Sequence, residues 1–77
     1  MWYVYLLKCI DNTLYCGATN NLDKRIDTHN AGKGAKYTKG RLPVVLLKAW
    51  EFNTKNEALK FEYKVKQLSR QEKLNLI

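Results

Sequence analysis

MWYVYLLKCIDNTLYCG, residues 1–17, contains two short apolar runs, at positions 2–7 and 14–17, separated by the polar pair Asp11-Asn12. Aromatic and β-branched residues dominate the first run and favour strands, whereas Asp and Asn favour turns. The pattern predicts a β-hairpin. We expect the rest of the chain to supply helices and a third strand that pack on this hairpin and bring charged groups to one of its faces.

The length of the hairpin loop decides on which face of the sheet two tyrosines lie. Side chains alternate between the faces of a strand, and residues opposite each other in an antiparallel pair point the same way. A two-residue turn would put Tyr5 and Tyr15 on opposite faces. A three-residue loop at 10–12, with Asn12 in the left-handed conformation, would set Leu7 opposite Tyr15 and both tyrosines on one face. We predict the three-residue loop. Tyrosines in strands are often ordinary core residues, and that alternative stays open.

The composition is that of one small domain. The chain has 77 residues, enough for a single domain over 1–77 with a modest core. It contains no apolar run of about 18 residues and no basic segment followed by an apolar core. We therefore expect no membrane span, no secretory signal and a cytoplasmic location. Cys9 and Cys16 form neither a CxxC nor a zinc pattern, and we expect buried or half-buried thiols in a reducing compartment.

The charge balance is strongly basic. The sequence has 14 Lys and Arg residues against 7 Asp and Glu residues, a net charge of +7. Because these charges are clustered, they favour a polyanionic partner over a role in solubility alone. We expect DNA as the partner, with RNA as the alternative, no membrane partner and a monomer.

A first helix is predicted to begin after Asn20, which can cap it, and to stop at Gly32. At about 100° per residue, four of its side chains share an arc about 100° wide. These are Leu22, Arg25, Ile26 and His29. Arg25 and His29 therefore lean towards the sheet. An arginine there can pack its stem on the apolar side and extend its charged end to solvent, and a lone histidine is often a core residue. Both alternatives stay open.

Residues 32–43, GKGAKYTKGRLP, are predicted to form a loop rich in glycine and positive charge. Glycines let a backbone approach a ligand closely, cations suit phosphates, and an aromatic ring can stack on a base or sugar. The spacing matches neither a P-loop nor a dinucleotide motif. We predict nucleic-acid contacts from five residues: Lys33, Lys36, Tyr37, Lys39 and Arg41. The alternative is a solvated loop with a packed tyrosine.

A third strand and a second helix complete the pattern. The strand is predicted over residues 44–52, and its first four residues, VVLL, are apolar on both faces. We expect this strand to be covered from both sides and to pair with the hairpin. Thr54 and Glu57 form a capping box that opens the second helix, and Ser69 and Glu72 form another that opens a final helical turn.

The second helix places a carboxylate among its apolar residues. Glu62 lies in the arc that Ala58, Phe61 and Val65 direct towards the core. A bare carboxylate there is strongly unfavourable unless it is paired, hydrogen-bonded or bound to a metal ion. A pair with a nearby Lys or Arg, or a helix rotation that leaves Glu62 at the rim, are the alternatives to a metal ligand.

Together these segments resemble the GIY-YIG nuclease family. Tyr3-Val4-Tyr5 corresponds to the Gly-Ile-Tyr half-motif, and Tyr15-Cys16-Gly17 corresponds to the Tyr-Ile-Gly half-motif. Residues 22–29, LDKRIDTH, look like the family's helix with its arginine and, four residues on, its His or Tyr. Residues 58–62, ALKFE, look like the helix that carries a metal-binding glutamate. The resemblance covers almost the whole chain and is closest to small stand-alone bacterial members.

The resemblance implies an α+β fold, with a three-stranded antiparallel sheet flanked by helices. It also implies a metal-dependent endonuclease that hydrolyses phosphodiester bonds in DNA with a single divalent cation, Mg²⁺ or Mn²⁺. By position, Tyr5 would act as general base or orient the attacking water, and Tyr15 would hydrogen-bond the nucleophile or the scissile phosphate. Arg25 would clamp the phosphate, His29 would assist proton transfer, and Glu62 would hold the metal ion.

Two departures from the family pattern bear on activity. Tyr3 replaces the glycine of the first half-motif, and Ala18 stands where some relatives carry a lysine. A tyrosine titrates near 10, so Tyr5 needs help from His29 or the metal ion to act as a base. Weak or partner-dependent activity is therefore expected. The alternatives are a non-catalytic nucleic-acid-binding module with a degenerate site and an interaction domain with no nucleic-acid role.

Overall fold

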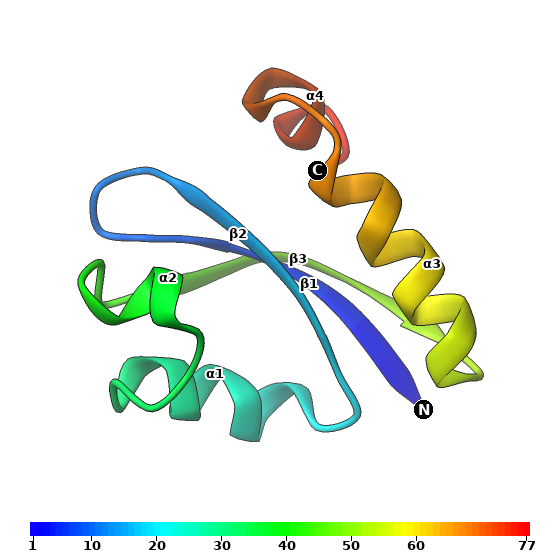
Figure 1. The fold of residues 1–77 in the computed structure, drawn as a ribbon, viewed down its shortest axis with the longest axis horizontal. Helices are drawn as coiled ribbons and strands as arrows, with labels where there is room; N and C mark the ends of the chain where they lie inside the picture. Colours follow the sequence, from blue (N-terminus) through cyan, green and yellow to red (C-terminus); the bar gives the residue numbers. More distant parts are fainter.

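An antiparallel sheet of three strands is the centre of the computed structural model, which describes residues 1–77. The strands β1 (Trp2–Lys8), β2 (Leu14–Thr19) and β3 (Val45–Phe52) lie in the order β2-β1-β3. The helices are α1 (Leu22–Asn30), α2 (Lys36–Lys39), α3 (Lys55–Lys66) and α4 (Arg70–Leu74). Figure 1 shows α1 and α2 on one side of the sheet and α3 on the other. The predicted α+β fold is confirmed. None of the four helices has both the length and the apolar character needed to cross a membrane.

The hairpin has the predicted register. Leu7 lies opposite Tyr15, and Tyr5 lies opposite Gly17. The loop is closed by a hydrogen bond of 2.9 Å from the Cys9 amide to the Thr13 carbonyl, so three residues connect the pair. Asn12, in the last loop position, has a φ of 67°, the left-handed conformation that such a loop requires. Both tyrosines therefore lie on one face of the sheet.

The central strand has a hydrophobic cluster on each of its faces, which is why four consecutive residues, 4–7, are buried. On one face, Val4 and Leu6 pack with Cys16 of β2 and with α3, through Ala58 and Val65. The opposite cluster contains Tyr5, Leu7, Cys9 and Val44, and Leu22 and Ile26 of α1 pack against it. Both cysteines are buried free thiols, as the sequence predicts.

The prediction that the third strand is covered from both sides is wrong. Of its apolar start only Val44 is buried, while Val45 and Leu46 are 49% and 41% exposed. A sheet of three strands has one interior position, and β1 occupies it, so β3 is an edge strand. The pairing also shifts between Leu6 and Leu7, whose partners are Lys48 and Leu46. This bulge leaves Leu47 as an extra residue on β3. The predicted pairing with the hairpin is confirmed.

Helix ends follow local capping, with one correction. The cap of α1 is Asn21 and not Asn20, because the Asn21 side chain accepts a hydrogen bond of 3.2 Å from the Lys24 amide. Beyond the other end of the helix, Gly32 has a φ of +76°, which confirms it as the stop. Thr54 caps α3 and Ser69 caps α4 as predicted, the latter with a full capping box.

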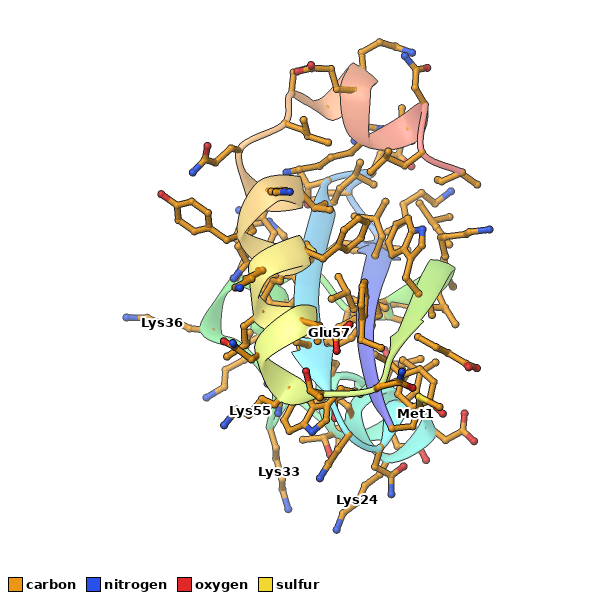
Figure 2. The ribbon with its side chains drawn as sticks, turned by 90° about the vertical axis from the view of Figure 1, so that its right-hand side faces the viewer. Met1, Lys24, Lys33, Lys36, Lys55 and Glu57 are labelled. Carbon is orange, nitrogen blue, oxygen red and sulfur yellow. The ribbon has the colours of Figure 1, made fainter.

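The segment predicted as a plain loop contains the short helix α2. Its first turn is held at Thr38, whose amide and hydroxyl both donate to the Ala35 carbonyl, at 3.1 Å and 2.9 Å. The lysines around it lie at the surface. Figure 2 shows Lys33 and Lys36 extending away from the ribbon, as does Lys24 of α1. The short helix α2 positions a buried threonine, Thr38, which contacts a residue of the candidate site.

Candidate active site

Three rings meet between the sheet and α1. Tyr5 comes from β1, Tyr15 from β2 and His29 from the last turn of α1. The ring centroids of Tyr5 and Tyr15 are 6.4 Å apart, and those of His29 lie 5.8 Å from Tyr5 and 5.4 Å from Tyr15. Tyr5 and His29 are buried, whereas Tyr15 is only half-buried. The sequence-predicted phenols and imidazole therefore form one cluster, with Tyr15 nearest to solvent.

The hydroxyl of Tyr5 connects this cluster to Arg25. It lies 2.9 Å from Nε2 of His29 and accepts a longer hydrogen bond of 3.4 Å from Nε of Arg25. Because Nε makes this contact, the two terminal nitrogens of the Arg25 guanidinium stay available for a ligand. The close fit depends on Gly17, where a Cβ would lie 2.4 Å from the Tyr5 hydroxyl oxygen. The glycine of the second half-motif thus leaves room for the tyrosine of the first.

A threonine that the sequence analysis missed determines which nitrogen of His29 carries the proton. Nδ1 of His29 lies 2.9 Å from the Thr38 hydroxyl oxygen, and that hydroxyl donates its own proton to the Ala35 carbonyl. The oxygen must therefore accept from Nδ1–H, which leaves the lone pair of His29 on Nε2. Nε2 in turn accepts the Tyr5 proton. A directed chain of hydrogen bonds runs from Tyr5 through His29 to Thr38.

No signal in the sequence pointed to Thr38, because it sits among lysines and glycines with no apolar periodicity around it. Gly34 is a second residue that was missed. A Cβ at Gly34 would lie 2.4 Å from Nδ1 of His29, so the loop backbone packs directly against the imidazole. Both contacts join the segment 34–38, which includes the start of α2, to the end of α1, and periodicity within one element does not reveal contacts of that kind.

Burial sets the protonation states of the pair. It raises the pKa of Tyr5 above its usual value of 10.0, outweighing the hydrogen bond from Arg25, which acts in the opposite direction. Burial also lowers the pKa of His29 below 6.5, and the positive charge of Arg25 lowers it further. At neutral pH the phenol is therefore protonated and the imidazole is neutral. Within this pair, His29 is the group that can take up a proton.

Glu62 approaches the cluster from the other side of the sheet. It belongs to α3, its side chain is 16% exposed, and its Oε2 lies 3.0 Å from Nζ of Lys66. The same ammonium lies 5.9 Å from the ring centroid of Tyr15. The pair of Glu62 and Lys66 thus lies close to the half-buried phenol, which belongs to the edge strand β2. Of the alternatives foreseen for this carboxylate, a lysine partner is the one present.

Glu62 suits only certain metal ions. No group of three or more His, Cys, Asp or Glu side chains is placed to hold a cation together. A single carboxylate does not fit a closed zinc site, which needs about four protein ligands. It does fit Mg²⁺ or Mn²⁺, because such hard ions keep several waters and share a substrate phosphate with one or two carboxylates. Lys66 would have to release Glu62 or share it.

An open polar cavity adjoins Arg25. Its volume is about 250 Å³, and it is bordered by hydroxyls, amides and two cations. The lining residues are Thr19, Asn20, Asn21, Lys24, Arg25 and Thr28. Arg25 therefore joins the buried chain of hydrogen bonds on one side to a cationic cavity on the other. Such a cavity can take an anion in contact with a guanidinium.

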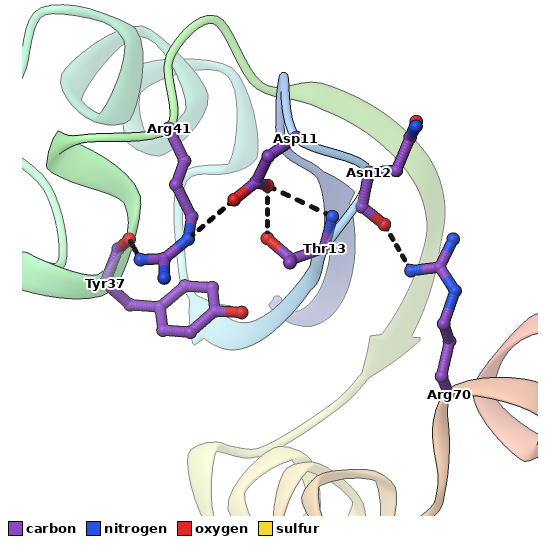
Figure 3. A network of polar contacts seen from close by, with 6 residues as sticks. All are labelled: Asp11, Asn12, Thr13, Tyr37, Arg41 and Arg70. Carbon is purple, nitrogen blue, oxygen red and sulfur yellow. Dashed lines mark hydrogen bonds and ion pairs between the residues drawn. The ribbon is translucent and has the colours of Figure 1, made fainter.

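The predicted nucleic-acid contacts separate into two groups. Lys33, Lys36 and Lys39 are exposed. Arg41 is instead held within the protein, with Nε 3.0 Å from Asp11 Oδ2 and a terminal nitrogen donating to the Tyr37 carbonyl at 2.7 Å. Its guanidinium also lies 4.2 Å from the ring centroid of Tyr37, and Figure 3 shows these contacts. Arg41 thus fixes Tyr37 against the hairpin turn.

Comparison with known proteins identifies the family to which this chain belongs. The family model of the GIY-YIG catalytic domain matches residues 1–75. A UPF0213 protein of Staphylococcus haemolyticus is 59% identical over 75 residues, which cover 97% of this chain and 92% of that protein. A UPF0213 protein of Clostridium perfringens is 57% identical over 77 residues, which cover 100% of this chain and 83% of that protein.

Among solved structures, the solution NMR structure of a UPF0213 protein from Bacillus halodurans is 51% identical. It superposes with a TM-score of 0.63 and covers 99% of this chain and 82% of that one. A protein from E. faecalis, also solved by NMR, is 38% identical with a TM-score of 0.62, covering 96% of this chain and 80% of that one. The match of the family model over nearly the whole chain and these relatives show that the chain belongs to the GIY-YIG nuclease family, within its UPF0213 group of bacterial proteins.

Proposed function

We propose that the protein is a metal-dependent endonuclease that hydrolyses phosphodiester bonds in DNA. The observation that carries this proposal is the meeting of Tyr5, Tyr15, Arg25 and His29 on one face of the sheet. A phosphodiester is an anion, so its hydrolysis is helped by a cationic clamp and by a group that removes the proton of the attacking water.

The hydrogen bonds suggest how the proton leaves. Burial keeps Tyr5 protonated, so its hydroxyl can accept a proton from water only as it passes its own to Nε2 of His29. Because Nδ1 carries its proton in the hydrogen bond to Thr38, Nε2 is unprotonated before this transfer. Tyr15, the half-exposed phenol, would hydrogen-bond the nucleophile or the phosphate. The terminal nitrogens of Arg25 would bind the phosphate oxygens in a bidentate way.

Glu62 is the residue that would hold the divalent cation, Mg²⁺ or Mn²⁺. When bound, the cation would supply charge neutralisation at the phosphate and at the leaving oxygen. The carboxylate is held by Lys66 at 3.0 Å, which orients it near Tyr15.

Cleavage of plasmid and of single-stranded DNA with Mg²⁺ or Mn²⁺ tests the proposal. The variants Glu62→Ala and Tyr5→Phe should lose cleavage. Their matched controls are Glu51→Ala, an exposed carboxylate of β3, and Tyr63→Phe, a phenol that is 68% exposed on α3; both should cut like wild type. Equal cleavage by all five proteins would mean that a contaminating nuclease does the work.

A nucleic-acid-binding module with a silent site is the second candidate. The pairing of Glu62 with Lys66 and the raised pKa of Tyr5 both favour it, because each opposes the active form of its residue. Binding that weakens with salt, without turnover under any divalent metal, would support this reading. Nicking that requires both a divalent metal and Glu62 would exclude it.

A further inference from the structure

A second pocket lies at the turn end of the hairpin, away from the cavity beside Arg25. Its volume is about 230 Å³, and it is formed where β2 begins and where α2 and α4 approach the turn. Its lining residues are Thr13, Leu14, Tyr37, Arg70 and Lys73. No pattern in the sequence assigned a role to Arg70 or Lys73. Neither residue belongs to the catalytic cluster.

Two cations in this pocket lack acidic partners. The protein contains two salt bridges, Arg41 with Asp11 and Lys66 with Glu62, and neither involves Arg70 or Lys73. Arg70 donates one terminal nitrogen to the carbonyl of Asn12, which orients its guanidinium at the turn and leaves its other donors free. The nearby Glu72 accepts a hydrogen bond of 2.9 Å from the Ser69 amide in the capping box of α4.

Tyr37 presents an edge and not a face to this pocket. Its ring stacks on Tyr15 at 5.9 Å between centroids and carries Arg41 over it at 4.2 Å. Figure 3 shows its hydroxyl directed towards the side of the turn where Thr13 and Arg70 lie. The tyrosine predicted to stack on a base is thus better placed to donate its hydroxyl. With Arg70 and Lys73, it offers a set of donors and no acceptor carboxylate.

We propose that this pocket binds a backbone phosphate of the same nucleic-acid strand, on one side of the scissile phosphate. The Tyr37 hydroxyl, Arg70 and Lys73 would contact the phosphate, and Leu14 would face the sugar. The volume is below the roughly 300–1,000 Å³ of pockets for drug-sized ligands, which suits one phosphate with its sugar. The stack of Tyr37 on Tyr15 connects the pocket to the catalytic cluster, one ring away. This inference rests on the proposed nuclease function.

Contacts of this kind position a strand without reading its sequence. Binding of a fluorescent single-stranded oligonucleotide, followed by anisotropy in EDTA over a range of salt concentrations, measures them directly. Lys73→Gln and Arg70→Gln should each weaken binding and reduce the slope of log K against log salt by about one. Lys60→Gln, which removes the same charge from the exposed side of α3, is the control and should keep the wild-type slope.

Lys73→Gln is the decisive variant, because the Lys73 side chain makes no hydrogen bond that the fold needs, whereas Arg70 also holds the Asn12 carbonyl. Amide NMR spectra verify that both variants are folded. In wild type, the amide signals of Thr13, Arg70 and Lys73 should shift on titration with the oligonucleotide. Equal slopes for Lys73→Gln and Lys60→Gln would overturn the inference. So would the absence of these amide shifts in wild type.

The failure of this inference is distinguishable from failure of the proposed function. Glu62→Ala should bind the oligonucleotide with an unchanged salt slope while losing cleavage. If wild type cuts nothing but Lys73→Gln lowers the slope, the phosphate pocket stands and the nuclease function falls. If cleavage depends on Glu62 but the slope of Lys73→Gln is that of wild type, the nuclease function stands and the pocket falls.

Discussion

The hydroxyl of Thr38 decides whether His29 can accept a proton at Nε2, because it is the acceptor for Nδ1–H. Thr38→Val keeps the shape of the side chain and removes the acceptor. The unpaired buried N–H should cost about 1–3 kcal/mol of unfolding free energy. Cleavage should fall by roughly 10- to 100-fold, a share of the 10²–10⁴ that general acid–base catalysis supplies.

Thr38→Ser is the rescue control, since it restores the oxygen without the methyl group. Nitrogen NMR of the His29 imidazole reports the tautomer directly, and it should change in the valine variant and return in the serine variant. A valine variant with the wild-type tautomer and the wild-type pH profile would show that Thr38 only fills space.

His29 should make stability fall on mild acidification. Its folded-state pKa lies below the ordinary 6.5, so the unfolded chain binds the proton more tightly. The contribution is fully present above about pH 6.5 and is lost as pH falls through the lower folded pKa. Urea unfolding at pH 7.5 and at pH 5.5 should show the decrease. Cleavage should decline in the same direction, because a protonated Nε2 accepts nothing from Tyr5.

His29→Gln separates this group from the carboxylates. The pKa values of Asp11 and Glu72 are held below their usual range, chiefly by hydrogen bonds from Thr13 and Ser69, so these groups lose their contribution at lower pH. If the glutamine variant keeps the full loss of stability between pH 7.5 and 5.5, His29 is not its source.

Gly17 leaves the space that the Tyr5 hydroxyl occupies. A methyl group there would lie 2.4 Å from the phenolic oxygen, so Gly17→Ala should displace the ring from His29. We expect a loss of about 1–3 kcal/mol, the usual cost of overpacking, with a larger fractional loss of cleavage. Gly40→Ala is the matched control, since a Cβ at that position meets nothing within 4 Å. Melting curves and plasmid nicking of both variants measure the difference.

At the scale of elements, most local signals in the sequence were reliable, apart from the α1 cap and the missed helix α2, whereas most contacts between elements could not be predicted. Asn12 specified the three-residue loop, and hence the shared face of the two phenols, because loop length fixes register. The Thr54 and Ser69 caps were also evident, because capping is a local signal as well. The edge position of β3 could not be deduced from residues 44–47, because an apolar run does not say which strand becomes central. The link from Thr38 to His29 depends on how the loop folds back on α1.

The contact between Lys66 and Glu62 within α3 should compete with metal binding. Lys66→Gln frees the carboxylate, so we expect the Mg²⁺ concentration for half-maximal cleavage to fall. The stability of the fold should change little, because pairs of this spacing contribute about 0.3–0.5 kcal/mol. Lys64→Gln removes an equal charge from an exposed site on the same helix and is the control. An unchanged metal requirement in Lys66→Gln would mean that Glu62 is not the metal ligand.

For the molecule as a whole, the two sides of the sheet differ in the residues that they carry. The side covered by α1 and α2 carries the phenols, the imidazole, the guanidinium and the cavity beside Arg25, while the side covered by α3 is mostly apolar core (Figure 1). The second pocket lies at the turn end of the hairpin, between α2 and α4. The Glu62 and Lys66 pair reaches from the second side towards Tyr15. The sequence predicted these five residues together, and the resemblance to the family placed Glu62 among them more firmly than its position on the helix did.

The two buried thiols offer a way to watch each side of the sheet separately. Cys16 belongs to the cluster under α3, where burial raises its pKa to about 11, and Cys9 belongs to the cluster under α1. Alkylating reagents attack thiolates, so the native fold should protect both sulfurs, and each becomes reactive only when its own layer lifts away. Mass spectrometry of the labelled chain would then compare the alkylation rates of Cys9 and Cys16. These rates report how often each side of the sheet opens, with no mutation and no attached probe.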